Sequence, residues 1–143
     1  MYPVTVDAFS SVPFGGNPAG VAVFEDKLPD EAEMRRIAAK MGYSETAFIL
    51  PLGGNRFRIR YFTPVEEVPL CGHATVGSFA YMLKTGLVRE GESYVAQTGA
   101  GDINVDIADG LVWLDMAEPK PLAFLNDTDS AALAAAYGIS AAD

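Results

Sequence analysis

Residues 74–83 limit the possible folds more than any other part of the sequence, because they include no charged side chain. Apolar or small residues occur on every side of the helix that this stretch predicts, and Lys84 and Gly86 supply a last turn and a stop. We therefore expect a helix buried all round. With roughly 12 residues it spans only about 18 Å, which suits a domain core and is too short for a membrane.

Short strands flank this helix along the chain. Strands are expected wherever apolar and polar side chains alternate or form short apolar runs, at residues 3–9, 20–24, 46–50, 57–62, 93–98, 102–107 and 111–116. Asp109-Gly110 favours a tight type I′ turn between the last two. An amphipathic helix covers residues 30–41, with a capping box of Asp30 and Glu33. The predicted fold class is α+β, with antiparallel strands wrapped around a central buried helix.

Charge and cysteine content exclude several kinds of partner. The 143 residues carry 19 acidic and 10 basic side chains, a formal net charge of −9, and no Lys/Arg cluster that could neutralise phosphates. Arg56, Arg58 and Arg60 share one side of a strand, which favours a solvated face. Cys71 is the single cysteine, and the start lacks a signal-peptide pattern. We expect a cytoplasmic protein without nucleic-acid or membrane partners.

The residues just before the buried helix are candidates for chemistry. Backbone N–H groups in a first helical turn lack helical partners, so a helix beginning at His73 or Ala74 could bind a carboxylate or a developing enolate oxygen. Gly72 lets a ligand approach the backbone, and the His73 imidazole can exchange protons, although it could equally be a simple cap. Cys71 could be reactive at this helix end, but without a second cysteine we favour a structural role.

Glu45 is the candidate carboxylate, because it directly precedes the apolar residues 47–50. A carboxylate at the mouth of a hydrophobic strand is partly desolvated and can both take and give a proton. A solvated glutamate, or one capped locally with Ser44, explains the spacing equally well. Asn17 to Gly20 are expected to form a rigid turn that could wall a pocket. The adjacent pair Glu66 and Glu67 cannot act jointly, and a solvated edge is expected there.

Four segments occur in a specific order: Asp7-Ala8-Phe9 with Gly16-Asn17-Pro18-Ala19; Ser44-Glu45-Thr46-Ala47-Phe48; Arg60-Tyr61-Phe62-Thr63-Pro64; and Cys71-Gly72-His73-Ala74-Thr75. Over about residues 1–116 this order resembles the N-terminal half of the PhzF-like isomerase family of phenazine biosynthesis. The resemblance implies the diaminopimelate epimerase fold. In that fold two similar domains each wrap an antiparallel β-barrel around a central helix, and the active site lies between them.

The resemblance also implies roles for individual residues. Glu45 and His73 would be catalytic, with Glu45 moving a proton between carbons of a small amino or hydroxy acid. The substrate, a small-molecule carboxylate, would be bound by Ser44, Gly72, His73, Asn17 and Cys71. No cofactor and no metal is implied.

We expect residues 1–116 to form the epimerase-like barrel domain, and residues 117–143 a linker and the start of an incomplete second domain. Proline breaks the strand pattern at 119–121, and an alanine-rich helix follows at 129–137. Because half of the implied site is missing, this chain alone is expected to have little or no activity. It is also expected to pair, as a homodimer or with a complementary second-domain chain. The alternative is a non-catalytic domain for carboxylate binding or assembly with a decayed family site.

Overall fold

The helix expected at residues 74–83 is the centre of the fold. The computed structural model describes residues 2–116 and 124–139, and it places this helix, α2, over Gly72–Thr85. Gly86 ends it in the left-handed conformation, at φ 79°. The helix starts before the predicted His73 or Ala74 because Cys71, with extended backbone, is already the N-cap residue.

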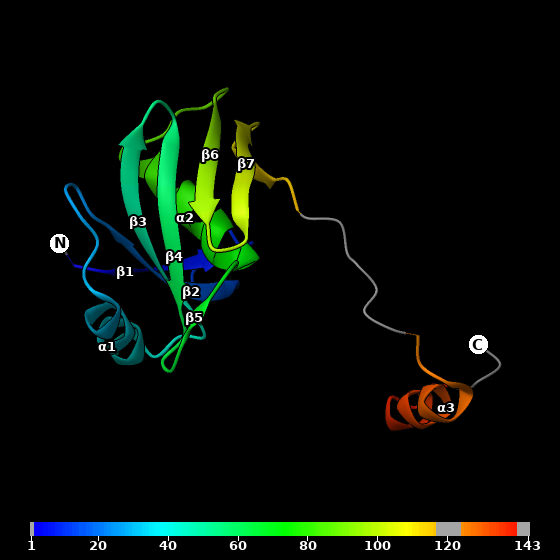
Figure 1. The fold of residues 1–143 in the computed structure, drawn as a ribbon. Coiled ribbons are helices and arrows are strands. Elements are labelled where there is room, and N and C mark those ends of the chain that lie inside the picture. The colour runs from blue at the N-terminus through cyan, green and yellow to red at the C-terminus, as the bar shows by residue number, and fades with distance from the viewer. Residues whose placement is uncertain (1, 117–123, 140–143) are drawn as a thin grey trace.

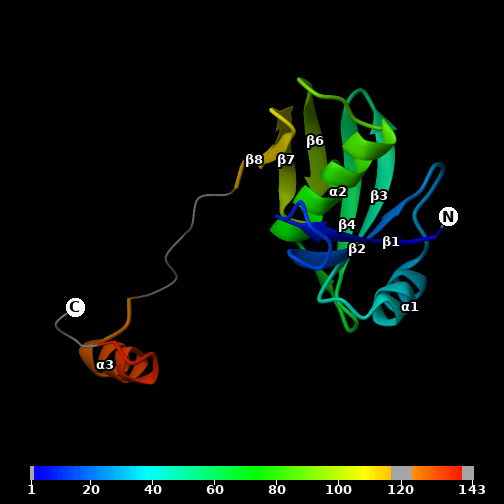
Figure 2. The ribbon, with the colours of Figure 1, turned by 180° about the vertical axis from the view of Figure 1, so that it is seen from behind.

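A single curled sheet wraps around α2 (Figures 1 and 2). Its strands are β1 (Val4–Ala8), β2 (Asn17–Val23), β3 (Thr46–Gly53), β4 (Arg56–Phe62), β5 (Glu67–Val68), β6 (Ser93–Thr98), β7 (Gly101–Ala108) and β8 (Leu111–Leu114). They follow the order β1-β2-β3-β4-β6-β7-β8, and β5 pairs with β4 beside this path. The predicted α+β architecture is confirmed, with one difference in strand direction. Strand β2 runs parallel to β3, and β4 runs parallel to β6, whereas the other neighbours are antiparallel.

Local turn chemistry fixes several element ends as expected. Helix α1 (Glu31–Met41) begins at Asp30, whose carboxylate accepts the N–H of Glu33 at 2.8 Å, and ends at Gly42 with φ 72°. The second half of the predicted capping box is absent, because the Glu33 carboxylate accepts from Arg36 instead. At the β7–β8 turn Asp109 and Gly110 both have positive φ, as a type I′ turn requires.

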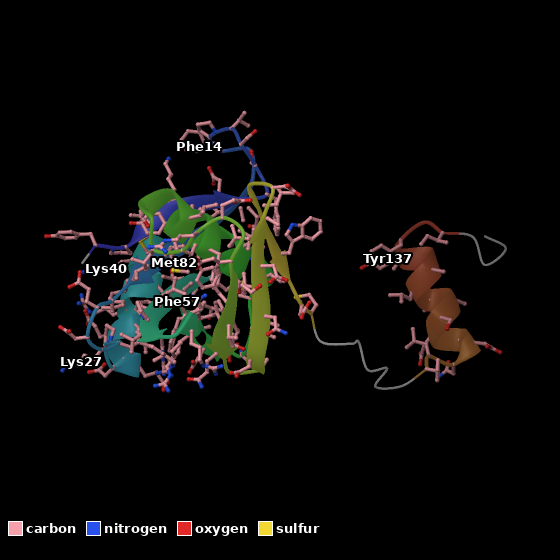
Figure 3. All side chains as sticks on the ribbon, turned by 90° about the horizontal axis from the view of Figure 1, so that it is seen from above. Phe14, Lys27, Lys40, Phe57, Met82 and Tyr137 are labelled. Carbon is pink, nitrogen blue, oxygen red and sulfur yellow. The ribbon has the colours of Figure 1, made fainter. Side chains whose placement is uncertain are left out.

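Two apolar clusters hold the layers together. The larger one fills the space between α2 and the concave side of the sheet, where Phe57 and Met82 lie in the interior (Figure 3). The smaller one joins Met34 and Ala38 of α1 to Phe48 on the convex side. Helix α2 thus covers the concave face of the sheet, whereas α1 covers only part of the convex face, over β3 and β4.

The sheet does not close around α2, and the helix is therefore not buried on every side as predicted. Strand β1 pairs only with β2, and β8 only with β7, within the described residues. Between these two edges lies an apolar groove of about 450 Å³, and Val76 and Ala80 of α2 line it. Ala80 is consequently exposed. The central helix has one open stripe.

Three further expectations concern the ends of the fold. Asn17 to Gly20 belong to β2 rather than to a turn; Pro18 is tolerated because β3 pairs with β2 only from Gly20 onward. Helix α3 (Asp127–Ala136) starts earlier than predicted, capped by Asn126. The proline segment at 119–121 lies outside the described residues. None of the helices in the described part of the chain is long and apolar enough to cross a membrane.

Candidate active site

Glu45 lies directly before β3, where the sheet holds its backbone. The N–H of Gly20 donates to the Glu45 carbonyl oxygen at 3.1 Å. A Cβ on Gly20 would lie 2.5 Å from Oγ1 of Thr46, so only glycine lets β2 approach β3 this closely. The position of Glu45 therefore depends on a tight backbone contact between the first residues of the β2–β3 pair.

His73 comes to Glu45 from the first turn of α2. Its Nε2 lies 3.5 Å from Oε2 of Glu45, and both side chains are mostly buried. On the other side of the same ring, Nδ1 lies 3.3 Å from Sγ of Cys71. The structure thus brings together Glu45, Cys71 and His73, three of the six predicted site residues.

The start of α2 leaves backbone donors without helical partners. The first hydrogen bond of the helix runs from the N–H of Thr75 to the carbonyl oxygen of Cys71, at 3.0 Å. Within the described part of the chain, the N-cap residue Cys71 forms no side-chain capping hydrogen bond, although the Ala74 N–H lies beside its sulfur. A Cβ placed on Gly72 would meet nothing within 4 Å. Space and donors for an anion therefore coincide beside Glu45.

Burial weakens the thiolate form of Cys71. Desolvation raises the pKa of its thiol to about 11, although the Ala74 N–H beside the sulfur acts in the opposite direction. The nearby Glu45 carboxylate raises this pKa further, because two like charges would lie side by side. Burial therefore opposes the activation that the helix end would give to this thiol.

Two buried hydroxyl groups support the helix start, and no role was predicted for them. Oγ1 of Thr75 donates to the Cys71 carbonyl oxygen at 2.7 Å, and the Tyr61 hydroxyl lies 2.6 Å from the same Oγ1. Both residues occur in the motifs that carried the family resemblance. Their hydrogen bonds connect Tyr61 of β4 to the backbone of Cys71, whose sulfur lies beside His73. Only the tertiary structure reveals this connection.

The remaining predicted site residues, Ser44, Asn17 and Gly72, differ in their surroundings. Ser44 and Asn17 are exposed, and no hydrogen bond of either side chain is found in residues 2–116 and 124–139. Gly72 is the first residue of α2 and adjoins both Cys71 and His73. The side chains of Glu45, Cys71 and His73 therefore contact one another in the candidate site. The side chains of Ser44 and Asn17 form no hydrogen bond with this cluster in the described residues.

Other polar groups named in the sequence have structural partners. Glu67 accepts from Nε of Arg60 at 2.6 Å, while Arg56 pairs with Asp102 and Arg58 with Gln97 across the strands. The three arginines share one side of β4 as predicted, but only Arg58 is exposed, whereas Arg56 and Arg60 are half-buried. A hollow of about 520 Å³ is lined by residues 24–27 and does not include the Glu45 cluster.

Comparisons with known proteins point to one family. The family model for phenazine biosynthesis-like proteins, PhzC-PhzF, matches residues 6–140. The uncharacterized isomerase YfhB of Bacillus subtilis (strain 168) is 40% identical over 139 residues, covering 96% of this chain and 47% of that protein. The chain spans about half the length of this relative, and about a third of the length of another, an uncharacterized isomerase of Escherichia coli.

Solved structures show the same fold. The crystal structure of a PhzF-family phenazine biosynthesis protein of Bacillus anthracis superimposes with a TM-score of 0.69 and 38% sequence identity. The match covers 78% of this chain and 38% of the length of the Bacillus anthracis protein. A predicted epimerase of Pseudomonas aeruginosa covers the whole chain and 52% of its own, with a TM-score of 0.78 at 22% identity. The latter likeness establishes the epimerase-like fold alone.

Proposed function

The chain belongs to the PhzC-PhzF family of phenazine biosynthesis-like proteins, and we propose that it contributes half of the active site of a cofactor-independent isomerase. The substrate would be a small amino or hydroxy acid. The observation that carries the proposal is the contact between Glu45 and His73 beside the open start of α2. A proton-accepting group and a set of free backbone donors lie side by side there.

In the proposed reaction Glu45 takes a proton from a carbon of the substrate. The electron pair of that C–H bond moves toward the adjacent acid group, giving an enolate-like oxygen. Backbone N–H groups at the start of α2 stabilise this developing charge, because they point out of the helix unpaired. The proton then returns to another carbon, or to the other face of the same carbon. No atom is gained or lost.

His73 would act together with Glu45. Its Nε2 is buried and has no hydrogen-bond partner in the part of the chain that the structure describes, so it is available to the carboxylate or to a bound substrate. Gly72 leaves space for the substrate acid group to approach the backbone. We assign Glu45 and His73 as the catalytic residues and Gly72 as a binding residue. Cys71, Ser44 and Asn17 would line the same site once a second half encloses it.

The enclosing half is part of the proposal. Polar acids are bound in concave sites that bury most of the ligand, and the Glu45 cluster lines neither the hollow at residues 24–27 nor the groove beside α2. The second half would come from another copy of this chain or from a complementary domain. Activity of the chain alone is therefore expected to be low. A cytoplasmic location belongs to the same proposal.

Deuterium incorporation tests the assignment. The chain is supplemented with a complementary second half and incubated in deuterated water with a panel of small amino and hydroxy acids. Carbon-bound deuterium in one acid, read by mass spectrometry, is the expected result. Replacing a general base costs about 10²-fold or more, so Glu45→Gln should reduce incorporation at least that much.

Glu66→Gln is the matched control, because Glu66 is exposed and lies outside the cluster. Its rate should equal that of the wild type. Incorporation by Glu45→Gln at the wild-type rate would remove Glu45 from the mechanism, provided that both variants unfold at the wild-type temperature.

A further inference from the structure

Three different donor side chains converge at the start of α2. One carboxylate oxygen of Glu45, the sulfur of Cys71 and a ring nitrogen of His73 all lie within 4.8 Å of one another. All three side chains are buried or nearly so, and they come from separate points of the fold, just before β3 and at the N-terminal end of α2. This combination of oxygen, sulfur and nitrogen is that of a protein site for a thiophilic divalent cation.

We propose that Glu45, Cys71 and His73 bind one Zn²⁺ ion, or a similar soft divalent cation, with a fourth coordination position left open. Ligand atoms of a tetrahedral zinc site are separated by about 3.3 to 3.6 Å, given the usual zinc–ligand distances. The sulfur already lies 3.3 Å from Nδ1 of His73, and the Glu45 oxygen lies 3.5 Å from Nε2. These contacts use different ring nitrogens, so binding requires a rotation of the imidazole that brings one nitrogen to the metal.

The protein leaves these donors available. Nε2 of His73 is buried and finds no hydrogen-bond partner among residues 2–116 and 124–139, and a metal ion would satisfy it. Within the described residues Glu45 has an ion contact with His73 alone, so no Lys or Arg competes for its carboxylate. The unpartnered Nε2 of His73 therefore faces the Glu45 carboxylate, and the Cys71 sulfur lies on the Nδ1 side of the same ring, with all three donors within 4.8 Å.

The charge balance selects the kind of ion. The positive end of α2 repels every cation, which disfavours hard ions such as Mg²⁺ that would be held through the carboxylate alone. A soft ion gains the thiolate and the imidazole as well, and its binding displaces the proton from Cys71. The site should therefore prefer Zn²⁺, Co²⁺ and Cd²⁺ over Mg²⁺ and Ca²⁺.

The metal site stands independently of the proposed isomerase activity. If both hold, the bound ion occupies the Glu45 oxygen that would accept the substrate proton. Zinc is then an inhibitor that chelation reverses, and it is not required for the reaction.

Cobalt titration of the whole chain tests the proposal. One equivalent of Co²⁺ is expected to give visible d–d bands of tetrahedral intensity together with a thiolate-to-cobalt charge-transfer band. Zn²⁺ should abolish both, whereas a large excess of Mg²⁺ should not. Cys71→Ser should remove the charge-transfer band, and Glu45→Gln and His73→Gln should each weaken binding about tenfold or more, the scale at which changes around metal sites act.

Glu66→Gln provides the control, because the Glu66 carboxylate is exposed and lies outside the cluster. The Glu66→Gln protein should therefore bind cobalt as tightly as the wild-type protein does. A weak spectrum of octahedral type in the wild-type protein would overturn the proposal without any variant. So would an unchanged charge-transfer band in Cys71→Ser. Neither result depends on substrate turnover, so failure of the metal site remains distinct from failure of the isomerase assignment.

Discussion

Oε2 of Glu45 lies 3.5 Å from Nε2 of His73, yet Nε2 has no hydrogen-bond partner within the described residues. The two groups are close enough to exchange a proton through a bound molecule, but they do not satisfy each other. Gly20 fixes the Glu45 backbone on one side, and the hydrogen bond from Thr75 to the Cys71 carbonyl fixes the helix start on the other. The pair is therefore held near contact by the fold and remains available to a ligand.

Gly72→Ala separates a role in ligand binding from a role in folding. An added Cβ meets no protein atom within 4 Å, and alanine favours a helix over glycine by about 0.5 to 1 kcal/mol. The variant should therefore be as stable as the wild type or slightly more so in urea unfolding. If substrate approaches the backbone here, the same variant should lose deuterium incorporation about tenfold or more. Full activity in a stable Gly72→Ala protein would place the acid group elsewhere.

The hydrogen bonds between Tyr61, Thr75 and the Cys71 carbonyl predict an asymmetric pair of variants. Tyr61→Phe removes one buried hydrogen bond, but Thr75 still donates to Cys71, so the expected loss is about 1 kcal/mol in the free energy of unfolding. Thr75→Val leaves the buried Tyr61 hydroxyl without its partner, which costs about 1 to 3 kcal/mol.

Urea unfolding of both single variants and of the double variant measures these losses. The double variant should be less destabilised than the sum of the two, because both single changes break the same bond. Additive losses, or a Tyr61→Phe variant less stable than Thr75→Val, would contradict the assigned hydrogen bonds.

Alkylation of Cys71 should be slow at neutral pH. Burial raises the pKa of this thiol to about 11, so its thiolate fraction at pH 8 is on the order of one in a thousand. Because the pKa is raised, the reactive form appears only as the pH rises toward that value. The iodoacetamide rate, followed by mass spectrometry in the folded protein, should climb about tenfold for each pH unit from 7 to 10. A rate that levels off below pH 9 would show a thiolate stabilised by the helix end.

The sequence was sufficient for features that depend on local chemistry. Gly42 and Gly86 end their helices in the left-handed conformation, and Asp109-Gly110 forms the expected tight turn, because each requirement lies within a few residues. The uncharged stretch before Lys84 correctly placed the central helix. These signals determined the element types and the central position of the helix.

The other features depend on tertiary contacts. The parallel pairing of β2 with β3 places Gly20 against Thr46, and nothing near either residue in the sequence encodes that contact. Motif resemblance singled out Glu45 and His73, but the convergence of both with Cys71 required the strand and the helix to be placed in space. The structure brings three of the site residues together, but the catalytic and binding roles assigned to all six of them remain predictions.

The open groove beside α2 predicts that the chain does not stay monomeric. Among residues 2–116 and 124–139, strands β1 and β8 each leave one edge unpaired there, and free edges with apolar surroundings are templates for pairing with another chain. Exposed apolar side chains surround the groove: Phe9 and Leu111 line it, and Phe14, which is 97% exposed, extends from the β1–β2 loop (Figure 3). Such a surface is seldom left bare by soluble proteins.

Light scattering at micromolar concentration should therefore give a mass of about twice 15.2 kDa, as expected for a two-fold pair. Leu111→Asp places a charge in the groove and should return the mass to that of a single chain. Leu87→Asp is the matched control, because Leu87 has a similar exposure, 47% against 55%, but does not line the groove. A wild-type mass of 15.2 kDa would refute self-pairing. Equal dissociation by both variants would show that the groove is not the interface.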